Sequence, residues 1–436
     1  MRAADGPPMN DAWTTTQRMK IHIHGGTLVD PASGTARKQD VYVAAGRIAA
    51  LGRAPDGFSP DRTIAAEGLV VAPGLVDLSA RVGAGRPSEI AAALAGGVTS
   101  VVCPPDTDPV LDEPGVVEML KFRARNLDQT RVYPLGALTV GLKGQVITGM
   151  VELTEAGCVA FSQADVPIVD TQVLLRALEY AGTYGYTAWL RPQDAHLAKG
   201  GVAASGAVAV RLGLSGVPVS AETVALHTLF ELVRATGARV HVAHLSSAAG
   251  VALMHAAKAE GLPVTCDVTI NHVHLIDNDI GYFDAQFRLD PPLRQQRDRD
   301  AIRAGLADGT IDAICSAHTP VGDDGKRLPF GDATPGASGL ELLLSLTVKW
   351  ADEAGVALAP ALARVTSASA DVLKLPAGRL APGAPADLCV FDPHAYWRVD
   401  PQRLESRGRN TPFAGYELPA VVRHTLVGGR VAFERS

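Results

Sequence analysis

The stretch APGLVDLSARVGAG, residues 72 to 85, joins a short apolar run to a polar ending. Leu75, Val76 and Leu78 have the apolar, partly β-branched character of a buried strand. Ser79 and Arg81 stand where that strand would end, and residues two apart on a strand point to the same side. The stretch therefore predicts a core strand that leads into a site.

Similar apolar runs alternate with helical stretches between residues 74 and 375. They are TSVVCPP, RVYPLGAL, CVAFSQ, YTAWLRP, RVHVAHLSS, LPVTCDV and IDAICSAH. Repeated βα units indicate parallel strands, and closure into a (β/α)8 TIM barrel is the commonest way to bury so many. An open doubly wound sheet is the alternative, although no G-x-G-x-x-G or Walker-type loop follows an early strand. In a barrel, the polar residues at the carboxyl ends of the strands form the site.

The two ends of the chain share a different pattern. KIHIHGGTLVDP and DVYVAAGRIAALG near one end, and ADLCVFDP and AVVRHTLVGGRVAFE near the other, alternate with period two around glycine-containing turns. We expect residues 19–73 and 376–436 to form one composite β-sandwich domain, with the α/β barrel at residues 74–375. Residues 1–18 lack the apolar core of a signal peptide and are expected to be a disordered N-terminal extension.

Composition and charge exclude several classes of protein. A hydrophobic content of 47% with only 5% aromatic residues is typical of a compact α/β protein. The net charge of −6 argues against a nucleic-acid partner, because phosphate binding needs clustered Lys and Arg. The chain also lacks the long apolar run of a membrane span. Five scattered cysteines in apolar runs fit buried thiols in a reducing cytoplasm.

The order of the longer motifs is similar to that of the amidohydrolase superfamily, and closely to that of bacterial dihydroorotase. The resemblance runs from about residue 20 to the end and is carried by APGLVDL (72–78), HVAHLSS (241–247), TCDVTINH (265–272), RLDPPLR (288–294), IDAICSAHTP (311–320), PGASGLE (335–341) and SRGRNTPFAGYEL (406–418). The resemblance implies a barrel in which zinc, held by an H-x-H pair after the first strand, hydrolyses a cyclic amide. It also implies where the ligands should stand.

Most of those ligand positions are degenerate. The H-x-H pair falls on Ser79, a poor zinc ligand, and Arg81, whose protonated guanidinium has no lone pair to give. By the same resemblance the bridging carboxylate, the next histidine and the catalytic aspartate fall on Gln163, Arg191 and Ala317. The remnants are one retained ligand, a second histidine on the same strand and one substrate contact, namely His244, His241 and Asn271.

Other histidines are weaker candidates. His196, His272, His274 and His318 lie near predicted strand ends, and His272 and His274 alone of these repeat the H-x-H spacing. His22 and His24 have that spacing too, but they belong to the terminal β module. Buried polar groups need partners, so we expect Arg81 and Arg191 to occupy the former metal region and to pair with acidic groups such as Asp165 or Asp194.

These observations imply a pseudoenzyme on a preserved scaffold, with no catalytic residue, metal or other cofactor. The family resemblance includes non-catalytic dihydroorotase homologues that associate with aspartate transcarbamoylase. We therefore expect a cytoplasmic subunit of pyrimidine biosynthesis that supports an aspartate transcarbamoylase complex, as a hetero-oligomer or homo-dimer. Two alternatives stay open. One is a zinc-dependent dihydroorotase or related cyclic amidohydrolase with an altered site, and the other is a metal-free binder of a small molecule.

Overall fold

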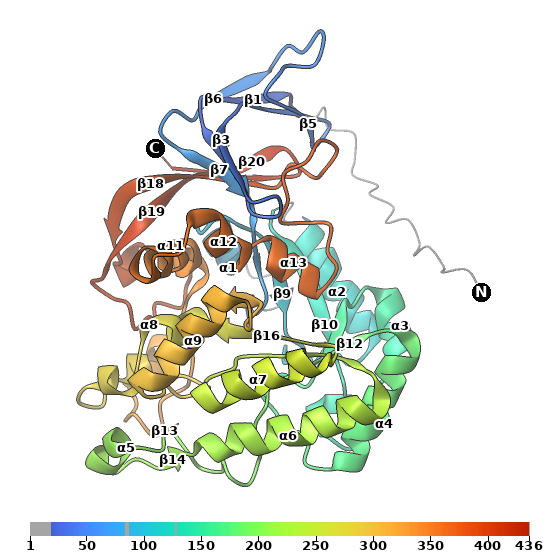
Figure 1. The fold of residues 1–436 in the computed structure, drawn as a ribbon, viewed down its shortest axis with the longest axis vertical. Helices are drawn as coiled ribbons and strands as arrows, with labels where there is room; N and C mark the ends of the chain where they lie inside the picture. The colour runs from blue at the N-terminus through green and yellow to red at the C-terminus, as the bar shows by residue number, and fades with distance from the viewer. Residues whose placement is uncertain (1–18, 83–86, 127–128, 436) are drawn as a thin grey trace.

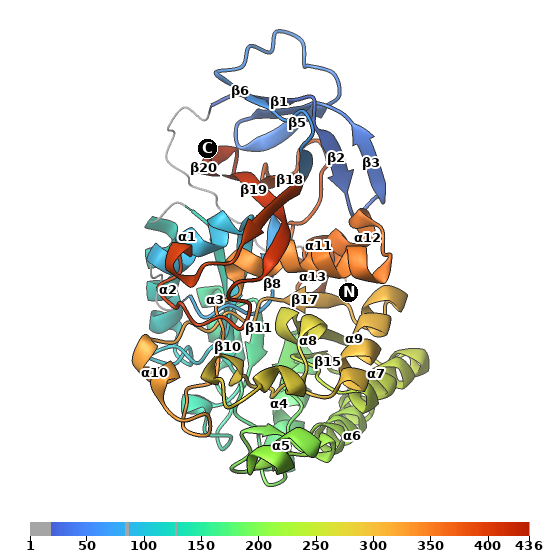
Figure 2. The same cartoon turned by 90° about the vertical axis from the view of Figure 1, so that its left-hand side faces the viewer.

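The computed structural model describes residues 19–82, 87–126 and 129–435, so the extension expected at residues 1–18 lies outside the described residues. Two regions lie one above the other (Figure 1). Strands from both ends of the chain, blue and red, form the smaller region, and the green to orange helices surround the larger one. Figure 2 shows the same two regions from the side.

Eight parallel strands of the described chain form the central sheet of the larger region. They follow one another in chain order as β8 (Leu75–Asp77), β9 (Val98–Cys103), β10 (Arg131–Ala137), β11 (Ala160–Ser162), β12 (Thr187–Leu190), β15 (Arg239–Val242), β16 (Val264–Thr269) and β17 (Ala313–Cys315). A parallel bridge between Ala80 and His318 joins the first strand to the last, with Arg81 N donating to His318 O at 2.9 Å. The sheet therefore closes, which confirms the predicted TIM barrel.

Helices that lie between these strands and after the last of them surround the barrel. They are α1 (Pro87–Ala95), α2 (Pro114–Asn126), α3 (Met150–Ala156), α4 (Thr171–Tyr184), α5 (Ala207–Leu212), α6 (Val219–Thr236), α7 (Ala248–Glu260), α8 (Ile270–His274), α9 (Gln296–Asp308), α10 (Asp323–Arg327), α11 (Leu343–Ala354), α12 (Leu358–Ala363) and α13 (Ser367–Val372). Local sequence sets their ends: the Asp170 carboxylate caps α4 through Gln172 N at 2.8 Å, and Gly185 ends α4 with a φ of 73°. In the described residues, no helix is both long and apolar enough to cross a lipid bilayer.

The smaller region is built from both ends of the chain. One sheet holds β1 (Ile21–His24), β4 (Val41–Ala44), β5 (Arg47–Leu51) and β6 (Arg62–Ala65). The other holds β2 (Thr27–Asp30), β3 (Thr35–Lys38), β7 (Val70–Pro73), β18 (Leu388–Arg398), β19 (Glu417–Val427) and β20 (Arg430–Glu434). β7 pairs with β2 on one side and with β18 on the other. Ile21, Val43, Val71, Leu388 and Leu426 fill the core between the sheets, which confirms the predicted composite sandwich.

Candidate functional site

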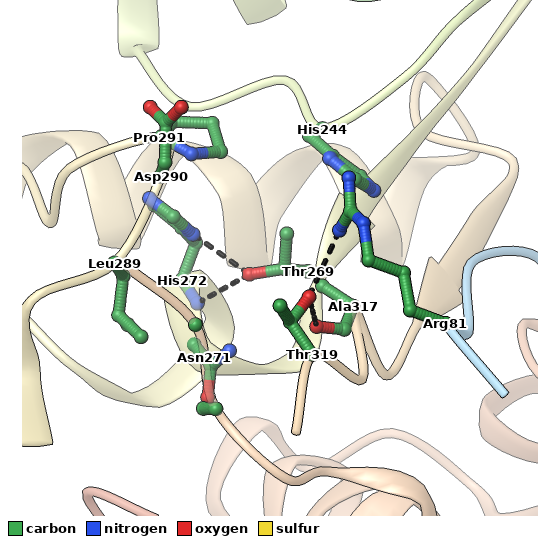
Figure 3. Close-up of a pocket in the computed structure, with 12 residues that line it drawn as sticks. Arg81, His244, Thr269, Asn271, His272, Leu289, Asp290, Pro291, Ala317 and Thr319 are labelled. Carbon is green, nitrogen blue, oxygen red and sulfur yellow. Dashed lines mark hydrogen bonds between the residues drawn. The ribbon is translucent and has the colours of Figure 1, made fainter. Parts of the chain in front are cut away.

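A small pocket opens at the carboxyl ends of the barrel strands. Among its lining residues are Arg81, His244, Asn271, Ala317 and Thr319 (Figure 3). Each of the first four follows a different barrel strand, and all four were singled out from the sequence as degenerate or remnant site positions. The mouth of the barrel therefore brings together the residues that the sequence placed there.

Arg81 lies in this pocket as the centre of a polar network. Its Nε donates to Asp106 Oδ2 at 2.9 Å, its Nη1 donates to Thr319 Oγ1 at 2.9 Å, and its Nη2 donates to Asp165 Oδ2. The side chains of Arg81, Asp106 and Asp165 are 24%, 28% and 29% exposed, so all three are largely withdrawn from water. The predicted pairing of Arg81 with Asp165 is confirmed.

Arg191 extends the same network on the neighbouring side of the mouth. Its guanidinium lies 3.4 Å from Asp165 Oδ1 and donates through Nη1 to Asp290 Oδ2 at 2.7 Å. Of the two acids predicted as partners, Asp165 contacts both arginines, whereas the Asp194 carboxylate accepts from the backbone amides of His196 and Leu197 in the following turn. An aspartate three residues after an arginine in a turn bonds locally more readily than it reaches back.

Asp165 is held ionised by its two arginine neighbours. Burial alone would raise the pKa of this carboxyl, but the guanidiniums of Arg81 and Arg191 outweigh burial and hold it well below its usual range. Burial alone would lower the pKa of both guanidiniums, but neighbouring carboxylates raise it, namely Asp165 and Asp106 for Arg81, and Asp290 and Asp165 for Arg191. At neutral pH Asp165 is therefore ionised, and the two arginines beside it are permanent cations with no lone pair to share.

The other degenerate positions are taken up by structural contacts. The buried Gln163 amide accepts from Thr139 Oγ1 at 2.9 Å and donates to Leu142 O at 2.8 Å. Buried Ser79 helps to close the barrel, since its carbonyl accepts from His318 N at 3.1 Å. Ala317 lines the pocket with a methyl group only. These side chains offer an amide, a hydroxyl and a methyl where the family uses zinc ligands and a base.

His241 lies on β15 and His244 is the second residue after it, and the two histidines differ sharply in environment. His241 is fully buried, with Nδ1 2.8 Å from Thr265 Oγ1 and Nε2 3.0 Å from Asp267 Oδ2. His244 is 6% exposed, and neither of its ring nitrogens has a hydrogen-bond partner among the described residues. Burial lowers the pKa of His244, so its imidazole is neutral and keeps a lone pair. Of the two, His244 alone has ring nitrogens free to accept a ligand.

In the described residues, the side chains of four other histidines considered from the sequence form no hydrogen bond with the arginine network. His318 Nε2 lies 2.9 Å from Glu89 Oε2, and the side chain of His196 is exposed to solvent. His22 and His24 contact Asp40 and Glu67 in the sandwich.

The H-x-H spacing of His272 and His274 does not act as it would on a strand, because both lie on helix α8, where residues two apart diverge. His272 Nδ1 lies 2.7 Å from Thr269 Oγ1, and His274 Nε2 lies 2.9 Å from Leu346 O. Burial lowers the pKa of these histidines to about 3 and about 4, so both rings are neutral.

Sequence reasoning missed Asp106, Asp290 and Thr319, which complete the arginine network. Asp290 belongs to the motif RLDPPLR and Asp106 to the turn CPPD, so both were visible as polar residues after apolar runs. Their convergence follows from barrel closure, which places loops from several strands around one mouth. A rule that collected every carboxylate after a predicted barrel strand would have found them.

Comparison with known proteins agrees with this architecture. The model of the "Dihydro-orotase-like" family matches residues 68–249, and that of the "Amidohydrolase family" matches residues 195–432. A "Dihydroorotase-like protein" of Pseudomonas putida is 46% identical over 95% of this chain and 99% of its own length. A "Dihydroorotase" of Anaeromyxobacter sp. (strain K) is 40% identical over 95% of this chain and 98% of its own length. The solved L-hydantoinase (dihydropyrimidinase) of Arthrobacter aurescens has a TM-score of 0.84 at 22% identity, covering 95% of this chain and 96% of that one.

A closed TIM barrel with a composite sandwich and a site at its mouth is the architecture of a barrel-type amidohydrolase. The chain belongs to the amidohydrolase family, within its dihydroorotase-like group. The residues at the positions of the family's metal site do not fit that metal, since two of them are guanidiniums engaged with carboxylates.

Proposed function

We propose that this protein is a non-catalytic dihydroorotase-like subunit of pyrimidine biosynthesis, and that it supports assembly of a cytoplasmic aspartate transcarbamoylase complex. The observation that carries the proposal is the position of Arg81. Its guanidinium stands at the end of the first barrel strand, bound to Asp106 and Asp165, where the family places an imidazole ligand.

The chemical argument concerns the first step of amide hydrolysis. That step needs a Lewis acid to activate water and polarise the carbonyl, and a base to take the proton. Arg81 and Arg191 donate hydrogen bonds only, and Ala317 has no group that accepts a proton. The guanidiniums of Arg81 and Arg191 hold the pKa of Asp165 low, which makes this carboxylate a poor base near neutral pH.

The preserved body of the fold supports a scaffold role. The barrel is closed, the sandwich has two sheets in the described residues, and buried apolar side chains fill the cores of both. The identity of 46% to a "Dihydroorotase-like protein" spans nearly all of both chains. An intact fold around a site that lacks the family's zinc ligands is consistent with selection for a surface that binds a partner protein.

Co-expression with the aspartate transcarbamoylase catalytic chain of the same organism tests the proposal. We expect one co-purifying assembly by size-exclusion chromatography with light scattering, and higher transcarbamoylase activity than the catalytic chain has alone. An established dihydroorotase, assayed beside it, controls for the hydrolase reaction. A transcarbamoylase chain that assembles and works equally well alone would overturn the assembly role.

A second candidate is an amidohydrolase with an altered site, because a relative that is 40% identical over nearly the full chain bears the name "Dihydroorotase". Zinc-dependent interconversion of dihydroorotate and carbamoyl aspartate by the purified chain would support it and contradict the proposal. A metal-free binder of a small molecule would show a rise in melting temperature with dihydroorotate or carbamoyl aspartate, and would not assemble with the transcarbamoylase chain.

A further inference from the structure

Three side chains that the proposed function does not use meet inside the barrel. A ring nitrogen of His244, a carboxylate oxygen of Asp267 and the Sγ of Cys315 all lie within 4.8 Å of one another, and all three residues are buried. Asp267 lies on β16 and Cys315 on β17, and His244 is the second residue after β15. These are three consecutive strands of the closed sheet. The family resemblance assigned a metal role to His244 alone, so the cluster is a different ligand set.

His244 is the group in this cluster that lacks a partner. Its ring is buried, and both nitrogens are without a hydrogen bond among the described residues. Its backbone has a φ of 56°, in the left-handed region, and its amide donates to Asp267 Oδ1 at 2.8 Å. A buried, unpaired imidazole in a disfavoured backbone conformation is costly, and such strain persists where the surroundings enforce it, often at ligand sites.

Asp267 is oriented by neighbours on its far side. His241 Nε2 lies 3.0 Å from Oδ2, while His241 Nδ1 lies 2.8 Å from Thr265 Oγ1 and the ring packs against Trp189. This arrangement of a carboxylate fixed by a hydrogen-bonded partner is the usual support for a metal ligand. It leaves Oδ1 facing the thiol of Cys315, whose Sγ lies 3.6 Å away.

The thiol hydrogen bond marks where a cation would sit. The Cys315 thiol donates a hydrogen bond to Asp267 Oδ1. A metal ion between the sulfur and the oxygen would replace the thiol proton, which would leave to solvent as the sulfur becomes a thiolate ligand. Imidazole, thiolate and carboxylate together are a ligand set of zinc, and a water from the pocket that His244 also lines would be the fourth ligand.

The charges around the cluster permit a cation. Arg81 and Arg191 are nearby, but Asp106, Asp165 and Asp290 surround them, so carboxylates outnumber guanidiniums before Asp267 is included. We propose that His244, Asp267 and Cys315 form a buried zinc site, set deeper in the barrel than the degenerate family site. Zinc there would tie three strands together beneath the arginine network, and the inference does not depend on the assembly role.

Metal analysis of protein purified without chelators tests the site. We expect about one zinc per chain, and in the cobalt-substituted protein a thiolate-to-cobalt charge-transfer band. Cys315→Ala and His244→Ala should lose both. Cys266→Ala is the matched control, because Cys266 lies beside Asp267 on the same strand with its Sγ directed to Thr310 O, and it should keep both.

Two results would overturn the site: wild-type protein that takes up neither zinc nor cobalt, or full metal retention in Cys315→Ala. If that variant does not fold, the wild-type cobalt spectrum decides by itself, because a bound cobalt without the thiolate band excludes Cys315. Zinc bound without dihydroorotate turnover leaves the proposed function intact, whereas failed assembly leaves the zinc result unaffected.

Discussion

Replacing Arg81 with alanine is the most direct test of the arginine network. The change removes one cation from two carboxylates and one hydroxyl. Breaking a fully buried ion pair by deleting one partner costs about 3–5 kcal/mol. Here the side chains of Arg81 and Asp165 are 24% and 29% exposed, and Arg191, which the substitution leaves in place, lies 3.4 Å from Asp165. We therefore expect Arg81→Ala to lower the free energy of unfolding by about 2 kcal/mol at pH 7.

Urea unfolding followed by circular dichroism measures this loss. A double-mutant cycle with Asp165→Ala should give a coupling energy of about 1–2 kcal/mol, because the two side chains are in direct contact. Arg62→Ala is the matched control, since Arg62 pairs with Glu434 at an exposed position of the sandwich, where a pair contributes less than about 1 kcal/mol.

The pH dependence of Arg81→Ala has a defined sign. In the folded protein the guanidiniums hold the pKa of Asp165 below its usual 3.8. The stability from this pairing is thus present above pH 3.8 and is lost as the pH falls toward the lower folded pKa. The gap between wild type and Arg81→Ala should shrink in that acid range. An Arg81→Ala variant as stable as wild type at pH 7, with no coupling to Asp165, would refute the reasoning.

Three further predictions concern the barrel and its core. Burial raises the pKa of Asp77 to about 7, although Ser316 N donates a hydrogen bond to its carboxylate at 2.8 Å. The contribution of Asp77 to stability is therefore full below pH 3.8 and is lost as the pH rises through 7. The stability of Asp77→Asn relative to wild type should therefore increase between pH 4 and 8 in urea titrations, and a flat difference would contradict this. Gly96→Ala should lower stability by at least about 2 kcal/mol, because the new Cβ would lie 2.2 Å from Leu340 O; Gly115→Ala, with open space around it, should be neutral or stabilising in thermal unfolding. The five cysteines are buried, so a chromogenic disulfide reagent should label none in folded protein and all in denaturant; rapid labelling without denaturant would disprove their burial.

The barrel and the sandwich were predictable because their strands have strong local patterns. Runs such as TSVVCPP and RVHVAHLSS carry β-branched residues that favour strands, and each became a barrel strand. Pairing of the two chain ends followed from their shared alternation of apolar and polar residues. Local pattern failed at His272 and His274, where a helical turn follows β16 directly and redirects both rings.

The site was predictable only in part, because spatial convergence is not written in local sequence. The pairing of Arg81 with Asp165 followed from the need of a buried cation for a partner. Asp290 was missed as the partner of Arg191, since the two are 99 positions apart and join only when the barrel closes. The cluster of His244, Asp267 and Cys315 was missed for the same reason, as its members come from three strands.

The position of β7 between β2 and β18 has a consequence for how the chain is made. During synthesis the amino-terminal strands leave the ribosome first, yet their central partner is encoded after the whole barrel. Until β18 emerges, one edge of β7 presents unpaired backbone groups, which is a template for wrong association between nascent chains. Chaperone occupancy should therefore be longest on the earliest strands, and a premature stop before β18 should send the product to aggregates or proteolysis, even though every barrel strand is already present.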